Sequence, residues 1–393
     1  MPDIPRLRFI PFRRADVLQM CSAELAGRPE SAAALASANE QIADYFQREF
    51  HDIKQQMKHA YGPLDPDADT RAVAEFRDKH AIDQLSYILE QFLDRANYEK
   101  VSPEQLQRAF ATASLFRLKL YVDLDEFEEA LLYTRGASPQ EEEVKSFFGL
   151  RRRRVQFMNF ERVVLFIRFR DDVDAQSTLG GCQPGSTMLK LFQNVPGADV
   201  EMLFPNTRVG MRLIDKLMIG VPAIVSGSVV MTTKLGATLV LLGSLAGYWL
   251  GVHAEPVELD RAAVLVLLAG LGTILGYLWK QYSSFRNRKL RFTQALTENL
   301  YFKLLDNNAG VLFRILDEAE ESECKESLLA YSFLLMSPKP LSASELDAEI
   351  EQWFAARWDC CFDFDVSDAL AKLELLGLAK NESGAWRPIS SHA

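Results

Sequence analysis

The sequence predicts an α+β membrane protein with a helical N-terminal domain and a small β-sheet, a two-helix transmembrane hairpin, and a helical, winged-helix-like C-terminal domain. Residues 235–252 and 262–279 form two runs of 18 residues without a charge. Each run is about long enough to cross a hydrocarbon core of ~30 Å, which predicts the hairpin. The polar stretches on either side predict domains at 1–212 and 282–393, separated by a membrane block at 213–281.

The N-terminal domain is expected to be helical over most of residues 15–150 and then to change to β-structure. The alanine-rich stretch 25–50 has apolar residues at helical spacing, and the SPEQ sequence that begins at Ser102 is a typical helix start. Residues 155–170 alternate in polarity and are rich in β-branched and aromatic side chains, which predicts two short strands. Residues 188–192 predict a third strand.

The apolar block is longer than two spans require. Residues 217–252 are almost continuously apolar and would form a helix of ~54 Å, so we expect a break near Lys234. The preceding part, 217–233, is ambiguous and could span, re-enter or lie on the membrane. Lys and Arg flank both ends of the block, whereas the loop 253–261 is mainly acidic. This distribution favours two spans with both termini cytoplasmic. We therefore expect a multi-pass protein of the bacterial inner membrane, or of a mitochondrial membrane in a eukaryote.

Small residues in the two spans predict close packing within the hairpin, because glycine lets two helix backbones approach each other. Neither span contains a charged side chain, which argues against an ion pathway and favours a membrane anchor. The glycines expected to form this contact are Gly243, Gly247, Gly251, Gly272 and Gly276.

The C-terminal domain is acidic, with 8 Lys and Arg against 18 Asp and Glu over residues 292–393. Its expected order of three helices followed by two short strands resembles a winged helix. The expected reading element, 363–376, is acidic and contains Lys372 as its one basic residue. Phosphates would repel it, so a protein partner is favoured over nucleic acid. The expected elements are helices at 325–336, 342–357 and 366–376 and strands within 378–389.

Two kinds of candidate site remain. A polar cluster could hold a cation or serve acid–base chemistry, although a helix cap followed by an exposed acidic face would give the same pattern. Two groups of cations are candidates for contact with anionic lipid headgroups. The polar cluster consists of Asp306, Asn307, Asn308, Asp317 and Glu321, and the cations are Arg151, Arg152, Arg153, Arg154, Arg286, Arg288, Lys289 and Arg291.

No enzyme motif stands out in the sequence. It has no P-loop, no GxSxG sequence and no glycine-rich dinucleotide fingerprint. We therefore assign no catalytic, metal-binding or cofactor-binding residue, expect no cofactor, and favour a protein that is not an enzyme. The expected partners are the lipid bilayer and either another protein or a second copy of the chain.

Several phrases resemble the family built on domain of unknown function 3754, which includes the mitochondrial transmembrane protein 143. They include RFIPFRRAD at 8–16, LFQNVPGADVEMLFP at 191–205 and LDNNAGV at 305–311. The resemblance implies two membrane spans between long polar domains, and it implies no reaction, ligand or catalytic residue.

The expected function is that of an integral membrane protein without enzymatic activity, acting as a protein-interaction scaffold or regulator. The alternative is an oligomeric channel or transporter in which residues 217–233 re-enter the membrane. The two differ in whether that segment faces an aqueous pore.

Overall fold

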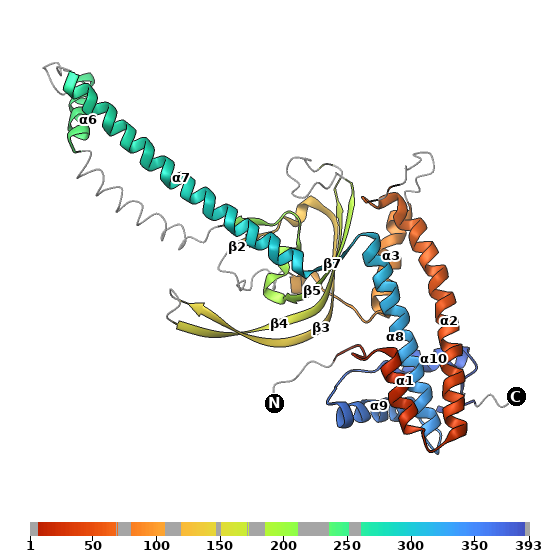
Figure 1. Ribbon diagram of the computed structural model, residues 1–393. Helices are drawn as coiled ribbons and strands as arrows, with labels where there is room; N and C mark the ends of the chain where they lie inside the picture. Colours follow the sequence, from red (N-terminus) through yellow and green to blue (C-terminus); the bar gives the residue numbers. More distant parts are fainter. Residues whose placement is uncertain are drawn as a thin grey trace. The chain divides into compact units, whose positions relative to one another are not determined.

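The computed structural model describes residues 7–67, 69, 80–106, 119–146, 151–170, 172, 185–210, 236–250 and 261–389. Its chain divides into two compact units, which we describe separately (Figure 1). The first unit combines Met1–Leu115, Val122–Thr207 and Lys303–Ala393, and the second combines Phe116–Tyr121 with Arg208–Phe302. Both ends of the chain therefore share one unit, although the sequence analysis assigns them to domains 1–212 and 282–393.

A five-stranded antiparallel sheet lies in the first unit, with the strand order β1-β3-β4-β5-β7. The two longest strands, β3 and β4, pair from Phe127 opposite Phe169 to Ser146 opposite Arg151. The central part of β4, residues 163–167, is fully buried on both faces. The strands are β1 (Glu99–Lys100), β3 (Phe127–Ser146), β4 (Arg151–Phe169), β5 (Thr187–Pro196) and β7 (Leu304–Asn307).

The expectation of helix up to residue 150 is wrong for residues 127–146, which form β3. Helix propensity is a weak preference, and pairing along almost the whole of β4 overrides it. At Gly136 the backbone has φ +71, and a Cβ built there would lie 2.9 Å from Glu161, so a residue without a side chain suits this position. Residues 155–169 belong to one long strand, not two short ones, whereas the strand expected at 188–192 is confirmed within β5.

Helix α8 is the centre of the helical part of the first unit. Between Ser322 and Leu335 every side chain of α8 is buried, because α1, α2, α3, α9 and α10 all pack against it. Even Lys325 is buried, and its ammonium donates to the carbonyls of Ile10 (3.0 Å) and Phe12 (3.1 Å). The helices are α1 (Arg14–Glu24), α2 (Pro29–Tyr61), α3 (His80–Arg95), α8 (Ala309–Met336), α9 (Ala343–Trp358) and α10 (Val366–Leu375).

The last part of the first unit has the helix–helix–helix–strand–strand order that the sequence predicts there. After α8, α9 and α10 come β8 (Ala379–Glu382) and β9 (Ala385–Pro388). Leu341 exchanges two backbone hydrogen bonds with Trp386, which adds a short third strand segment beside β9. Positive φ angles at Ser383 and Gly384 form the tight turn between the two strands.

Short 3-10 turns connect several of these elements. Residues 197–203 form the 3-10 turn η4 (Gly197–Leu203). The other turns within the described residues are η1 (Gly62–Leu64) and η3 (Leu124–Glu126).

The described residues of the second unit form one short strand pair and two helices. Strand β2 (Lys119–Tyr121) pairs antiparallel with β6 (Arg208–Gly210). The helices are α6 (Gly236–Trp249), which has 14 residues, and α7 (Arg261–Lys303), which has 43. The ambiguous segment 217–233 and the acidic part of the connecting loop, 253–260, lie outside the described residues.

The expected membrane fold and the inner-membrane location are corrected by the structure. Within the ranges given above, no helix combines the length and the apolar character that crossing a membrane requires. The second apolar run, 262–279, lies within α7, which continues without a break into the basic region that contains Arg286. The fold is mixed α and β, with a five-stranded antiparallel sheet.

Replacing Ser342 by alanine tests how much local sequence contributes to the fold. Ser342 accepts a hydrogen bond from the Glu345 backbone, and the Glu345 carboxylate accepts one from the Ser342 backbone. We expect Ser342→Ala to lower the free energy of unfolding by about 1 kcal/mol, because this capping box starts α9. Urea denaturation checks the value, with Ser367→Ala, at an exposed position in the first turn of α10, as the control.

Candidate functional site

A charged pocket with a volume of about 510 Å³ lies in the first unit, among α2, α3, α8 and α10. Its charged lining contains six carboxylates but three cations. Tyr45, Phe46 and Leu375 contribute apolar surface to its wall. The carboxylates are Glu49, Asp94, Glu323, Glu326, Asp365 and Asp368, and the cations are Arg8, Arg95 and Lys372.

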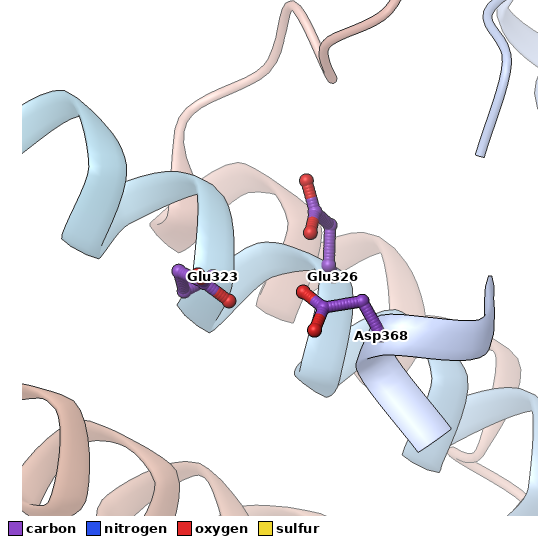
Figure 2. Close-up of side chains that lie close together, drawn as sticks. All are labelled: Glu323, Glu326 and Asp368. Atoms are coloured by element: carbon purple, nitrogen blue, oxygen red, sulfur yellow. The ribbon is translucent and has the colours of Figure 1, made fainter. Parts of the chain in front are cut away.

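Helical spacing brings two pairs of these carboxylates together. Glu323 and Glu326 are three residues apart in α8, and Asp365 and Asp368 have the same spacing at the start of α10. Residues three apart lie on the same side of a helix. Packing of α10 against α8 therefore makes Asp368 converge with Glu323 and Glu326, as Figure 2 shows. One carboxylate oxygen from each of these three residues lies within 4.8 Å of the others.

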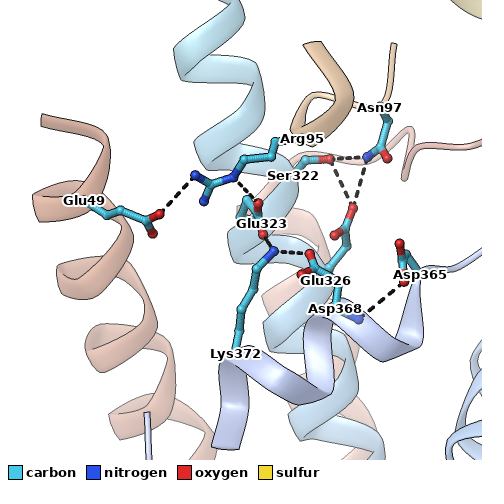
Figure 3. A network of polar contacts seen from close by, with 9 residues as sticks. All are labelled: Glu49, Arg95, Asn97, Ser322, Glu323, Glu326, Asp365, Asp368 and Lys372. Carbon is cyan, nitrogen blue, oxygen red and sulfur yellow. Dashed lines mark hydrogen bonds and ion pairs between the residues drawn. The ribbon is translucent and has the colours of Figure 1, made fainter. Parts of the chain in front are cut away.

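Glu323 is the most deeply buried carboxylate of the pocket, with 1% of its surface exposed. Arg95 Nε donates to Glu323 Oε1 at 2.6 Å, and another guanidinium nitrogen of Arg95 donates to Glu49 at 3.0 Å. The Lys372 ammonium forms ion pairs with both Glu323 and Asp368. Figure 3 shows how these contacts join α2, α3, α8 and α10. Two cations, Arg95 and Lys372, thus neutralise the buried carboxylate of Glu323.

Each of the two cations, Arg95 and Lys372, also lies over an aromatic ring. The Arg95 guanidinium lies 4.5 Å from the centre of the Phe50 ring. The Lys372 ammonium lies 5.8 Å from the centre of the Phe46 ring. The negative face of an aromatic ring attracts a cation, so the pocket combines carboxylates and rings in a way that suits basic side chains.

Glu326 has a different environment, because no cation of the described residues forms an ion pair with it. Its Oε1 accepts hydrogen bonds from Asn97 Nδ2 (3.0 Å) and Ser322 Oγ (3.4 Å). Burial, together with the charges of Asp368 and Asp365, raises the pKa of Glu326 to about 7, against the lowering effect of the Asn97 hydrogen bond. Burial and the neighbouring Asp365 also raise the pKa of Asp368. Glu326 therefore changes charge near neutral pH.

The residues of the predicted polar cluster lie in different surroundings in the structure. Asp306, Asp317 and Glu321 line a second, open cavity of about 560 Å³ along α8. There Arg314 pairs with Asp306 at 3.0 Å and approaches Glu318 at 3.7 Å. Cation binding or acid–base chemistry at this surface stays a prediction.

The two asparagines of that cluster have structural contacts instead. Asn307 lies in β7 and pairs with Lys190 of β5. Asn308 is buried, accepts a hydrogen bond from the Leu189 backbone at 3.2 Å and donates one to Asp67 at 2.6 Å. These contacts connect the start of α8 to the sheet.

The structure leaves the other two groups of predicted contacts untested. A Cβ built on Gly243, Gly272 or Gly276 meets no described atom within 4 Å, so close packing of the hairpin stays a prediction. Gly247 lies in α6, and Gly251 lies outside the described residues. The predicted lipid contacts also stay predictions; their cations are Arg151, Arg152, Arg153 and Arg154 in β4, and Arg286, Arg288, Lys289 and Arg291 in α7.

With the fold and the pocket described, the chain can be compared with known proteins. Residues 160–310 match the model of a family described as "Protein of unknown function (DUF3754)". The match confirms the family that the sequence phrases indicate. No solved structure matches the chain. The likeness to transmembrane protein 143 stays a prediction.

The DUF3754 match and the charged pocket involve different parts of the chain. The matched segment contains most of β4 and all of β5, β6, α6, α7 and β7. All the residues that line the pocket lie outside residues 160–310. The family description therefore carries no information about the pocket.

The sequence analysis missed Glu49, Arg95, Glu323, Glu326 and Asp368 as site residues. A local signal was present, because ECKE at 323–326 and DVSD at 365–368 both place two carboxylates three residues apart. Such pairs are common on exposed helix faces, and nothing in the sequence showed that these two would face each other. Their convergence depends on the packing of α10 against α8.

Removing Arg95 tests whether the buried ion pair holds the helices together. We expect Arg95→Met to lower the free energy of unfolding by about 3 kcal/mol, because it leaves Glu323 buried with Lys372 as its remaining cation. Arg95→Met/Glu323→Gln should recover part of this loss. Denaturant unfolding measures both, and Arg48→Met, which breaks an exposed pair with Asp44, should cost less than about 0.5 kcal/mol.

Glu326 predicts a specific pH dependence of stability. Its pKa in the folded chain lies above the ordinary value of 4.5, so the folded state holds this proton more tightly than the unfolded state. The free energy of unfolding that this bound proton contributes is fully present below pH ~4.5, and it is lost as the pH rises through about 7.

We therefore expect Glu326→Gln to become more stable relative to the unmodified chain, by on the order of 2 kcal/mol, between pH 5 and pH 8. Thermal unfolding across this range measures the difference. Parallel pH profiles for the two proteins would contradict the assignment of this transition to Glu326.

Proposed function

We propose that the protein is an interaction scaffold without enzymatic activity, and that its charged pocket binds a basic segment of a partner protein. The observation that supports this proposal is the excess of carboxylates over cations in a cavity with aromatic and aliphatic walls. Complementary charge promotes association and selects the partner.

The pocket already contains two examples of the proposed contact. Arg95 and Lys372 each combine an ion pair to Glu323 with an aromatic ring on the other side. Arg95 pairs with Glu49 and Glu323, and Lys372 pairs with Glu323 and Asp368. The lining contains three further carboxylates, those of Asp94, Glu326 and Asp365. A basic side chain from a partner would meet the same kind of surroundings.

The size of the cavity favours a side chain over a bare ion. A volume of about 510 Å³ is in the range of pockets that hold organic groups, roughly 300–1,000 Å³. The apolar surfaces of Tyr45, Phe46 and Leu375 can cover the aliphatic stem of a Lys or Arg whose charged end meets the carboxylates. A nucleic acid is disfavoured, because its phosphates would face the same negative charge.

Binding of a labelled basic peptide tests the proposal. The probe is a fluorescent peptide of alternating Arg and Ala, and fluorescence anisotropy at physiological salt gives its dissociation constant with the full chain. At pH 8, where Glu326 is ionised, we expect Glu326→Gln/Asp365→Asn to weaken binding by about tenfold, because two carboxylates of the lining lose their charge. Asn at position 365 can still cap α10, as Asp365 does through the Asp368 backbone.

The matched control is Asp363→Asn/Glu374→Gln, which makes the same change in net charge at two exposed positions outside the pocket lining. Equal weakening by the two double variants would show that the peptide senses only the overall negative charge, which would contradict the proposal. Saturable displacement of the peptide by micromolar MnCl₂ would identify the pocket as a metal site instead.

A further inference from the structure

Helix α7 carries a row of large, exposed apolar side chains. Each of these five side chains is between 59% and 71% exposed. The rings of Trp279 and Tyr282 lie 6.3 Å apart, on the same side of the helix. The row consists of Leu265, Leu268, Leu275, Trp279 and Tyr282.

These positions follow the spacing of a coiled-coil contact. From Leu265 the steps are three residues to Leu268, four to Gly272, three to Leu275, four to Trp279 and three to Tyr282. Alternating steps of three and four place all six residues on one narrow stripe, which faces a partner helix when two helices wrap around each other. Gly272 belongs to this stripe, and a Cβ built on it meets no described atom within 4 Å.

Side-chain size favours an antiparallel pair of identical helices. In that arrangement Gly272 lies opposite Leu275, Leu268 opposite Trp279, and Leu265 opposite Tyr282. Each layer then combines a larger residue with a smaller one, which fills space evenly. A parallel pair would place Gly272 against Gly272 and Trp279 against Trp279, which leaves a gap in one layer and crowds another.

Charge favours the same orientation. From Lys280, near the end of the stripe, to Arg291, α7 contains five cations and no acidic residue. A parallel pair would bring these two basic regions together, whereas an antiparallel pair places them at opposite ends of the contact. The basic residues are Lys280, Arg286, Arg288, Lys289 and Arg291.

The area is sufficient for a dimer. The five exposed side chains present on the order of 600 Å² per copy, or about 1,200 Å² for a pair, which reaches the lower end of the range for specific interfaces. We propose that α7 forms an antiparallel contact between two copies of this chain through the stripe Leu265–Tyr282. This inference goes beyond the proposed pocket function and does not depend on it.

Sedimentation velocity of the purified full chain tests the contact. We expect the unmodified chain to be a dimer, and Leu268→Glu/Leu275→Glu to raise the dimer dissociation constant by about 100-fold or more, because charges would face apolar side chains. The matched control, Thr273→Glu/Asn287→Glu, adds the same charge at exposed positions of α7 off the stripe and should remain dimeric. Circular dichroism checks that both variants keep their helices.

Cysteine cross-linking tests the orientation independently of any destabilising substitution. Leu265→Cys/Tyr282→Cys should form an intermolecular disulfide under mild oxidation, whereas either single variant should remain at the background level of the unmodified chain, which has five cysteines of its own. Efficient cross-linking of Leu265→Cys alone would overturn the antiparallel arrangement.

Two further results would overturn the dimer itself. One is an unmodified chain that sediments as a monomer at micromolar concentration. The other is a monomer that floats with phosphatidylglycerol–phosphatidylcholine vesicles and loses this binding in Leu268→Glu/Leu275→Glu, because lipid would then cover the stripe.

Discussion

The burial of Glu323 is the constraint on which the arrangement of the helices depends. A carboxylate that is 1% exposed is costly to remove from water, by several kcal/mol, unless cations and hydrogen bonds compensate it. Arg95 of α3 and Lys372 of α10 both form ion pairs with Glu323, and Arg95 also forms an ion pair with Glu49 of α2. Four helices must therefore meet around one side chain of α8. Apolar contacts alone tolerate small shifts between helices, whereas this network specifies which residues lie opposite each other.

The same constraint produces the pocket. Because the two inner cations cannot neutralise all the carboxylates around them, the site keeps an excess of negative charge. Burial, together with the charges of Asp368 and Asp365, raises the pKa of Glu326. The residues that line the pocket come from sequence positions between Arg8 and Leu375, on both sides of the segment that matches DUF3754. The matched segment supplies part of β4, all of β5 and β7, and the long helix α7, and the flanking segments supply the charged site.

The two units depend on different physical interactions. The first buries a broad apolar core and resolves its buried charges by pairing. In α7 of the second, large apolar side chains lie exposed at regular spacing along the helix. An apolar surface of this kind is stabilised when another surface covers it. We therefore regard α7 as an assembly element, and the helices around α8 as the recognition element.

The sequence by itself determined the local features. Ser342 and Glu345 specify the start of α9, Asp365 caps α10, and the run 188–192 forms a strand, because short-range hydrogen bonds and side-chain alternation control these choices. Tertiary structure decided the rest. Residues 127–146 are a strand because β4 pairs with them, and Glu323 meets Asp368 because α10 packs on α8. Local apolar length predicted two membrane spans, but within the described ranges no helix has the length and apolar character to cross a membrane. Pairing and packing join residues far apart in the chain, and local patterns contain no information about which distant segments meet.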